Sequence, residues 1–286
     1  MKILITGGKG MLGRTLQESF KDDEVIIADL PECDITDRSS IAAFFAEADP
    51  DVVIHAAAMT NVDGCEANSE LAYKINEEGT RNVAIVSAAM NARLIAISTD
   101  YVFSGELDEG RESWSEEDTP RPRTVYGASK FAGEEMIRAL YPEAVVLRVA
   151  WLYGAGGPSF VHTMVKLLSS EGEAVKVVND QFGNPTSAKA VADVIKFILS
   201  KPSVEGTVHA TCEGVASWYD LAGELKKLMP SLKRELVPCT TAEFPRPAPR
   251  PANSALEKRV LKLLGYTMSD WREALADFVL TEFKSN

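Results

Sequence analysis

The chain has 286 residues, 45% of them hydrophobic, and a formal net charge of −12. This length allows a large buried core, and the negative charge argues against nucleic acid or an anionic membrane as the main partner, because both attract cationic surfaces. Four cysteines are scattered without a Cys-x-x-Cys pair, which argues against a zinc site or a disulfide framework.

The first half alternates short β-rich runs with longer amphipathic stretches. Near-continuous apolar runs, typical of buried parallel strands, occur at Lys2–Thr6, Glu24–Asp29, Asp51–Ala56, Arg93–Ser98 and Ala144–Ala150. Helical patterns separate them at Gly10–Phe20, Arg38–Ala48, Ser69–Met90 and Val125–Leu140. This alternation predicts an α/β fold with a doubly wound, Rossmann-like parallel sheet.

The second half has a different pattern, in which helical stretches dominate and the strand candidates are short. The predicted helices are Phe160–Ser169, Ala188–Leu199, Ser217–Leu228, Ala255–Leu264 and Trp271–Phe283. The Pro/Arg-rich segment 245–251 is neither a regular helix nor a central strand, and we expect it to be extended at the surface. We therefore expect a dinucleotide-binding domain over 1–150, to which parts of the second half return, and a mainly substrate-binding lobe over 151–286.

A glycine loop, Thr6-Gly-Gly-Lys-Gly-Met-Leu-Gly13, follows the first predicted strand and opens the first predicted helix. Glycine permits the tight turn and the close backbone approach of a pyrophosphate, and the helix N-terminus supplies N–H donors. The spacing is Gly-x-x-Gly-x-x-Gly rather than Gly-x-Gly-x-x-Gly. The loop residues expected to contact a dinucleotide are Gly7, Gly10, Met11, Leu12 and Gly13.

Asp29, at the end of the second predicted strand, is placed to accept hydrogen bonds from ribose hydroxyls, which favours NAD over NADP. The alternative is a turn residue of Asp29-Leu-Pro, and Lys9, Arg14 and Arg38 leave room for a 2′-phosphate. Cofactor preference therefore stays open between NADPH and NADH. Asp34 and Ile35 precede the next helix and are weaker candidates for adenine contacts. After the third strand, Ala56, Ala57 and Ala58 let a flat cofactor approach the backbone, whereas His55 is expected to pack locally.

The most specific chemistry lies in Tyr126-Gly-Ala-Ser-Lys130, which places a phenol and an ammonium on one face of a predicted helix. A neighbouring cation favours the phenolate, so we expect Lys130 to move the pKa of Tyr126 towards neutrality. Thr99 closes the fourth predicted strand at the carboxyl edge of the sheet, where doubly wound folds bind ligands. Each residue alone is an ordinary polar residue, but their order after a glycine loop indicates a proton-delivery site.

The chain resembles the extended short-chain dehydrogenase/reductase family, because the glycine loop, His55-Ala-Ala-Ala58, Thr99 and Tyr126-x-x-x-Lys130 match its motifs in order. Within this family it is similar to the dTDP-4-dehydrorhamnose reductases. The residues that carry this narrower resemblance are Ser98-Thr-Asp-Tyr-Val-Phe103, Trp151-Leu-Tyr-Gly154, Asn179-Asp-Gln-Phe-Gly-Asn-Pro-Thr186 and Arg250-Pro-Ala-Asn-Ser-Ala-Leu256.

The resemblance implies reduction of the C4 ketone of a dTDP-6-deoxy-4-ketohexose by NADPH or NADH, in dTDP-L-rhamnose synthesis. It implies Tyr126 as the proton donor, Lys130 as the residue that tunes it and holds the ribose, and Thr99 as a hydrogen-bond partner of the carbonyl. The implied substrate contacts are Asp100, Tyr101 and Trp151, with Asp63, Gln181 and Arg250 as weaker candidates. Trp151 is alternatively a core residue between the lobes.

Some family members form a dimer bridged by magnesium through glutamates. This chain has Thr15 at one of those positions, so we expect no structural metal and a monomer or a metal-independent homodimer. The start of the chain lacks a signal-peptide pattern and no apolar run has membrane-spanning length, so we expect a cytoplasmic protein. The alternatives are another nucleotide-sugar ketoreductase or epimerase, and a binding subunit resembling the regulatory subunit of methionine adenosyltransferase.

Overall fold

The computed structural model describes residues 1–283, and its centre is a parallel six-stranded sheet. The strands are β1 (Lys2–Thr6), β2 (Glu24–Ala28), β3 (Val52–His55), β4 (Arg93–Thr99), β5 (Val145–Val149) and β10 (Gly206–His209). Their order is β10-β5-β4-β3-β1-β2, with parallel pairing throughout. The prediction of a doubly wound α/β fold is confirmed, and the order reverses between β1 and β3.

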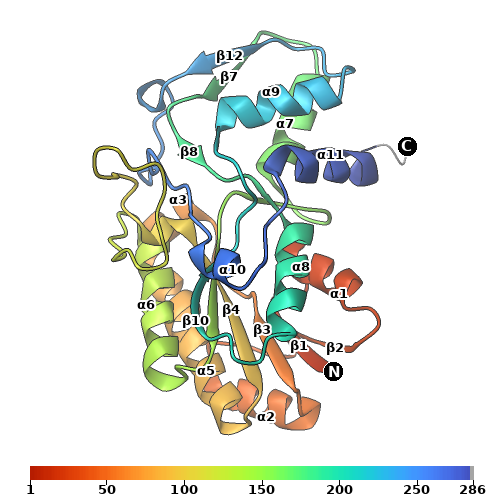
Figure 1. The fold of residues 1–286 in the computed structure, drawn as a ribbon, viewed down its shortest axis with the longest axis vertical. Helices are drawn as coiled ribbons and strands as arrows, with labels where there is room; N and C mark the ends of the chain where they lie inside the picture. Colours follow the sequence, from red (N-terminus) through yellow and green to blue (C-terminus); the bar gives the residue numbers. More distant parts are fainter. Residues whose placement is uncertain (284–286) are drawn as a thin grey trace.

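Helices cover both faces of this sheet (Figure 1). On one face, α1 (Met11–Ser19) packs against α8 (Ala188–Leu199), and on the other lie α2 (Arg38–Ala48), α5 (Thr80–Ala89) and α6 (Val125–Leu140). Neighbouring residues of β1 divide between two cores: Ile3 and Ile5 belong to the cluster that includes α8, whereas Leu4 packs with Ile41 of α2. This division follows from the alternation of side chains along a strand.

Most of the second half forms a smaller layer beyond the carboxyl ends of the strands, at the top of Figure 1. Its helices are α7 (Phe160–Ser169), α9 (Trp218–Leu228) and α11 (Trp271–Glu282), and β7 (Val175–Val178) pairs with β12 (Leu236–Cys239). Short pairs join β6 (Leu152–Tyr153) to β9 (Thr186–Ser187) and β8 (Phe182–Gly183) to β11 (Ala216–Ser217). The 3-10 turn η3 (Thr241–Glu243) also belongs to the second half, whereas the 3-10 turn η2 (Asp100–Val102) directly follows β4. The second half also returns to the sheet, through α8 and the edge strand β10.

Two helix predictions differ from the structure, the first in its internal geometry and the second in its extent. The predicted helix Ser69–Met90 is divided into α4 (Ser69–Tyr73), the π-helical turn η1 (Lys74–Gly79) and α5. In that turn the Asn76 amide donates to Met59 O and Ser129 Oγ, contacts that periodicity does not reveal.

The helix predicted at Ala255–Leu264 begins only at Arg259, as α10 (Arg259–Leu263). The preceding backbone is extended because Ala255 and Glu257 both bond to Trp114 through their main chains. Helix α3 (Val62–Ala67) and strand β10 were not predicted. Among residues 1–283, no helix has the length and apolar character needed to cross a bilayer.

Candidate active site

A cavity of about 980 Å³ lies at the carboxyl ends of the parallel strands. Gly7 follows β1, Ala56 follows β3, Thr99 ends β4 and Ala150 follows β5, and all four line the cavity. Residues of the second half, among them Pro158 and Trp218, also contribute to the lining. The cavity is therefore at the switch point where doubly wound sheets bind ligands.

The glycine loop forms one wall of this cavity. Gly7 has φ +68°, and a Cβ on it would lie 2.7 Å from the Ala57 backbone, so both the turn and the neighbouring segment after β3 require glycine. Gly10 is the N-cap of α1 and provides no side-chain hydrogen bond to the first turn. The first N–H groups of α1 are thus left for a ligand, which fits a pyrophosphate at a helix N-terminus.

The second strand ends at Ala28, and Asp29 begins the turn that follows it. The Asp29 carboxylate accepts hydrogen bonds from the backbone N–H groups of Lys9 at 2.9 Å and Leu30 at 2.8 Å. Asp29 therefore fixes the glycine loop as well as lining the cavity. Asp34 and Ile35 also line it, although Asp34 accepts from Thr36 and the helix N-cap is Asp37.

His55 is buried and hydrogen-bonded at both ring nitrogens, to Thr6 Oγ1 at 2.7 Å and to Thr80 Oγ1 at 3.0 Å. Burial, together with the charge of Lys130, lowers the pKa of His55 to about 3. Its role is structural, as expected from the sequence. The three alanines that follow, Ala56 to Ala58, line the cavity beside the glycine loop.

The hydroxyl, phenol and ammonium predicted to act together all line this cavity. Thr99 Oγ1 donates to Asp100 Oδ1 at 3.0 Å and accepts from the Tyr101 N–H at 3.2 Å. Tyr126 is the second residue of α6 and contacts the Tyr101 ring edge-on, with centroids 5.6 Å apart. One turn later, Lys130 Nζ donates to the carbonyl of Ile97 on β4 at 2.8 Å.

Two neighbours hold the start of α6 in place. Thr124 caps the helix by accepting from Gly127 N at 2.9 Å, and Glu66 of α3 accepts from Val125 N at 2.8 Å. A Cβ at Gly127 would collide with the Tyr101 carbonyl oxygen, so glycine there permits α6 to lie against the end of β4. The position of Tyr126 is thus set by capping and close backbone approach.

One electrostatic expectation is wrong. Burial raises the pKa of the Tyr126 phenol above its ordinary value, and the Thr99 hydroxyl opposes only part of this rise. The Lys130 ammonium donates to the Ile97 carbonyl, and burial outweighs any cation effect on the phenol. Burial also lowers the pKa of Lys130 to about 8, although Glu134 acts in the opposite direction. The pair therefore holds a protonated phenol beside a weakly acidic ammonium.

The sugar-side candidates divide into two groups. Asp100, Tyr101 and Trp151 line the cavity. Burial raises the pKa of Asp100 to about 6, although hydrogen bonds from the Ser254 and Thr99 hydroxyls act in the opposite direction. Asp63, Gln181 and Arg250 do not line the cavity. The Gln181 amide accepts a hydrogen bond from the Trp218 indole and donates one to the Thr241 hydroxyl.

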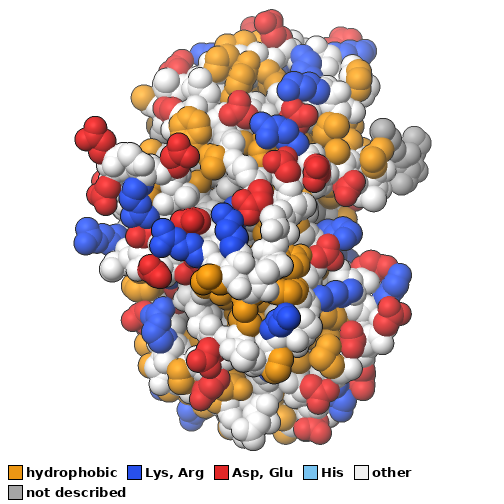
Figure 2. All heavy atoms as spheres, viewed as in Figure 1, with side chains coloured by type: hydrophobic (Ala, Val, Ile, Leu, Met, Phe, Trp, Pro, Cys, Tyr) orange, Lys and Arg blue, Asp and Glu red, His pale blue; other side chains and the backbone are white. Residues whose placement is uncertain are grey.

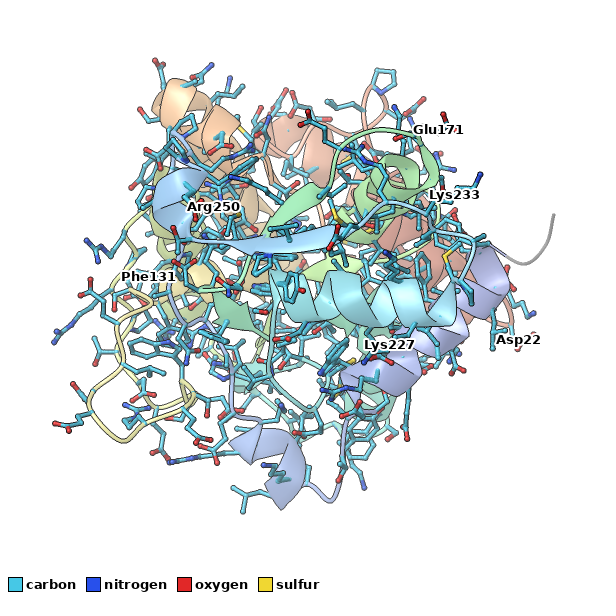
Figure 3. All side chains as sticks on the ribbon, turned by 90° about the horizontal axis from the view of Figure 1, so that it is seen from above. Asp22, Phe131, Glu171, Lys227, Lys233 and Arg250 are labelled. Atoms are coloured by element: carbon cyan, nitrogen blue, oxygen red, sulfur yellow. The ribbon has the colours of Figure 1, made fainter. Side chains whose placement is uncertain are left out.

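Asp63 and Arg250 bind each other, although 187 residues separate them. The Arg250 guanidinium donates two hydrogen bonds to the Asp63 carboxylate, at 2.9 Å and 3.0 Å. Arg246 donates a third, at 2.7 Å. Seen from above, Arg250 lies on the same side of the molecule as Phe131 of α6, away from Asp22 and Lys227 (Figure 3). The ion pair joins the Pro/Arg-rich segment to α3.

Several cavity residues were not identified from the sequence. Leu71 and Lys74 come from the segment around the π-helical turn, and Pro158 and Trp218 come from the second half. Trp218 belongs to no motif that the sequence shows, and it is identified as a cavity residue only because it stacks on Trp151 in the folded chain. Among residues 1–283, no group of three or more His, Cys, Asp or Glu side chains is arranged to hold a metal ion.

Comparison with known proteins gives similarities along nearly the whole chain. The family model described as the RmlD substrate binding domain matches residues 1–283. A crystal structure of dTDP-4-dehydrorhamnose reductase from Clostridium acetobutylicum is 42% identical, with a TM-score of 0.92 and coverage of 98% of both chains. The dTDP-4-dehydrorhamnose reductase of Bacillus anthracis, solved in complex with NADP, is 37% identical, with a TM-score of 0.92 and coverage of 98% of this chain and 99% of its own.

A relative named for a different activity is about as similar. It is a probable dTDP-4,6-dihydroxy-2-methyloxan-3-one 4-ketoreductase of Streptomyces antibioticus, 40% identical over 97% of this chain and 94% of its own.

Proposed function

This chain belongs to the RmlD substrate binding domain family, and we propose that it reduces the C4 ketone of dTDP-4-dehydro-6-deoxy-L-mannose (dTDP-4-dehydrorhamnose) to give dTDP-L-rhamnose. The observation that carries the proposal is the single cavity that joins the glycine loop to Thr99, Tyr126 and Lys130. The two dTDP-4-dehydrorhamnose reductases of similar structure support the choice of substrate. The protein is therefore an NAD(P)H-dependent oxidoreductase.

We propose Tyr126 as the proton donor. A donor has to carry its proton when the ketone arrives, and the raised pKa of the buried phenol keeps Tyr126 protonated. Thr99 would donate a hydrogen bond to the same carbonyl oxygen, where negative charge develops. Lys130 would then stabilise the phenolate that remains and hydrogen-bond the cofactor ribose.

The residues that fit a dinucleotide follow one side of the cavity. The uncapped first turn of α1 would hold the pyrophosphate, and Asp29 lies beside the loop, where ribose hydroxyls would be held. Asp34, Ile35 and the three alanines after β3 would contact the adenosine and the nicotinamide side. The reduced nicotinamide, when bound, supplies the hydride. The NADP complex of the Bacillus anthracis relative supports NADPH, and Asp29 supports NADH, so both are proposed as cofactors.

The sugar would lie against Asp100, Tyr101 and Trp151, which line the cavity. We propose residues 1–150 together with α8 and β10 as the dinucleotide-binding domain, and the remainder of 151–286 as mainly the substrate lobe. Asp63 and Arg250 do not line the cavity, but their ion pair would shape the sugar side of the site from behind its wall.

We also propose a monomer or metal-independent homodimer in the cytoplasm, without a nucleic-acid partner. On the face shown in Figure 2, Lys and Arg side chains are interspersed with Asp and Glu, so no broad cationic field is present on that face. The four cysteines are all buried and free, which suits a reducing compartment.

A second candidate function is reduction of a different dTDP-4-ketosugar, which the similarity to the Streptomyces antibioticus 4-ketoreductase favours. Both candidates use the same three residues and differ in the sugar. A single panel separates them: dTDP-, UDP- and GDP-linked 4-ketosugars, each mixed with NADPH and with NADH, followed at the reduced nicotinamide band. We expect fastest oxidation with dTDP-4-dehydrorhamnose. Faster turnover of another sugar would contradict the substrate assignment, and no turnover in any arm would contradict the activity.

A further inference from the structure

Two indole rings form a stacked wall in the cavity. The Trp151 and Trp218 centroids lie 3.5 Å apart with an interplanar angle of 2°. Both side chains are half-buried and both line the cavity that contains Tyr126. Trp151 follows β5 of the dinucleotide-binding sheet, whereas Trp218 opens α9 in the C-terminal layer. The stack therefore connects the segment that follows β5 to α9 at the site.

The Trp151 indole is confined on a further side. Its backbone has φ +47°, a left-handed conformation that non-glycine residues rarely adopt. A Cβ at Gly183 of β8 would lie 2.5 Å from Cε2 of this indole, so only glycine leaves room for the ring. The same Cβ would lie 2.6 Å from Nε1, so the N–H edge of the indole is packed against Gly183.

Trp218 is held by a chain of hydrogen bonds. Its Nε1–H donates to Gln181 Oε1 at 3.1 Å, and Gln181 Nε2 donates to Thr241 Oγ1 at 3.0 Å. Thr241 in turn donates through its hydroxyl to Asp180 at 2.6 Å. The Phe160 ring lies 4.7 Å from Trp218. The Trp218 plane is thus determined by the protein, and its N–H is already used.

We propose that Trp218, fixed by Gln181, is a positioning residue that holds the Trp151 indole flat against the sugar site. Gly183 completes the frame by leaving space for the ring. The proposal rests on the proposed function and assigns Gln181, which does not line the cavity, a role in substrate affinity. Stacked aromatic rings stabilise one another beyond the area they bury. Loss of the stack should therefore weaken the hold on the sugar without affecting the dinucleotide.

Three substitutions test this arrangement from three sides: Trp218→Leu removes the stacked ring, Gln181→Met removes its anchor, and Gly183→Ala displaces the Trp151 indole. Each should raise KM for the nucleotide sugar about three- to tenfold and leave kcat within about threefold. KM for NADPH should stay near the wild-type value, and a thermal unfolding curve should show that each variant is folded at the assay temperature. The matched control is Gly223→Ala in α9, the helix of Trp218, because a Cβ there meets no atom within 4 Å.

A spectroscopic measurement reports on the stack itself. The chain has four tryptophans, so 5-fluorotryptophan labelling gives a 19F spectrum that single Trp→Phe variants assign. Trp218→Leu and Gln181→Met should both shift the Trp151 resonance, because the ring current of the stacked partner is lost or moved, whereas Gly223→Ala should not. Addition of dTDP-4-dehydrorhamnose should shift the Trp151 resonance in the wild-type protein.

The outcomes are separable. If the wild-type enzyme turns over dTDP-4-dehydrorhamnose and the three variants have the wild-type KM for it, the positioning role is wrong. An unmoved Trp151 resonance in Trp218→Leu and Gln181→Met would also overturn it, whatever the activity. A wild-type protein that oxidises no NADPH with any 4-ketosugar would instead contradict the proposed function, while the 19F shifts would still decide whether Trp218 positions Trp151.

Discussion

Tyr126 and Lys130 lie one helical turn apart, but burial acts on them in opposite directions. It raises the pKa of the phenol and lowers that of the ammonium to about 8, because each group is disfavoured in its charged form. A phenol that keeps its proton suits ketone reduction, in which the proton leaves only as the carbonyl oxygen becomes negative. Lys130 then stabilises the phenolate only while the ammonium itself remains protonated.

The pH dependence of kcat/KM should report this ammonium. As pH rises through about 8, Lys130 loses its positive charge and the rate should fall, because kcat/KM for the ketosugar reflects ionisations of the enzyme before it binds the ketosugar. Lys130→Arg is the control, since a guanidinium stays charged throughout the accessible range. Steady-state rates at constant saturation with NADPH provide the measurement. An identical alkaline fall in Lys130→Arg would assign the ionisation to another group.

At the scale of single residues, the sequence predicts those sites whose neighbours are close along the chain. The glycine loop and the Tyr126/Lys130 pair depend on local turn and helix geometry, and the structure brings them to one cavity. Trp218 could not be predicted, because its partner Trp151 lies on a distant element. The pKa of Tyr126 is raised rather than shifted towards neutrality, because spacing indicates a nearby cation but not the depth of burial.

At the scale of elements, the short helix α3 connects two parts of the site. Through Glu66 it holds the first N–H of α6, and through Asp63 it holds the Pro/Arg-rich segment. Partial burial alone would raise the pKa of Asp63, but the hydrogen bond from Arg250 contributes to a net lowering. Periodicity does not predict so short a helix, and its partners lie far away in the sequence.

Asp63→Asn should loosen the Pro/Arg-rich segment, because Arg246 and Arg250 lose their shared carboxylate. We expect the free energy of unfolding to fall by about 1–3 kcal/mol, with a higher KM for the nucleotide sugar and an unchanged KM for NADPH. Urea unfolding and steady-state kinetics measure these effects.

The control is Glu106→Gln, which removes the more exposed ion pair between Glu106 and Arg123 and should cost no more than about 1 kcal/mol. Equal losses from the two substitutions would contradict the special role given to Asp63.

At the scale of the whole molecule, the strand–helix alternation was sufficient to predict the parallel sheet, because buried parallel strands are continuously apolar. The end of the chain was harder to predict. Ala255 and Glu257 have a helical pattern, yet long-range backbone bonds to Trp114 keep their segment extended. The return of β10 to the sheet edge likewise depends on pairing with β5 rather than on its own four residues. Tertiary contacts override local preference in both cases.

Acid stability should reflect buried groups from both halves. Burial is the largest cause of the low pKa values of His55 and His209, which are about 3. Between pH 6 and 5, both histidines therefore bind a proton in the unfolded chain but stay neutral in the folded protein. Asp100, whose pKa burial raises to about 6, binds a proton in the folded state and offsets one histidine. These three groups should together lower stability by about 1.4 kcal/mol per pH unit on acidification.

Asp100→Asn removes the offset, so the same acidification should lower the free energy of unfolding about twice as steeply. Urea unfolding at several pH values in this window, for the variant and the wild-type protein, gives both slopes. A slope that is unchanged or shallower in Asp100→Asn would contradict the buried, protonated state assigned to this carboxyl.

The assignment of Tyr126 as proton donor is tested most directly by single-turnover reduction of dTDP-4-dehydrorhamnose in Tyr126→Phe, which keeps the ring and removes the hydroxyl. Loss of the reduced nicotinamide band should slow by at least about a hundredfold, while the Kd for NADPH stays within about twofold of the wild-type value. Hydride transfer at the wild-type rate in Tyr126→Phe, with dTDP-L-rhamnose as product, would contradict the account.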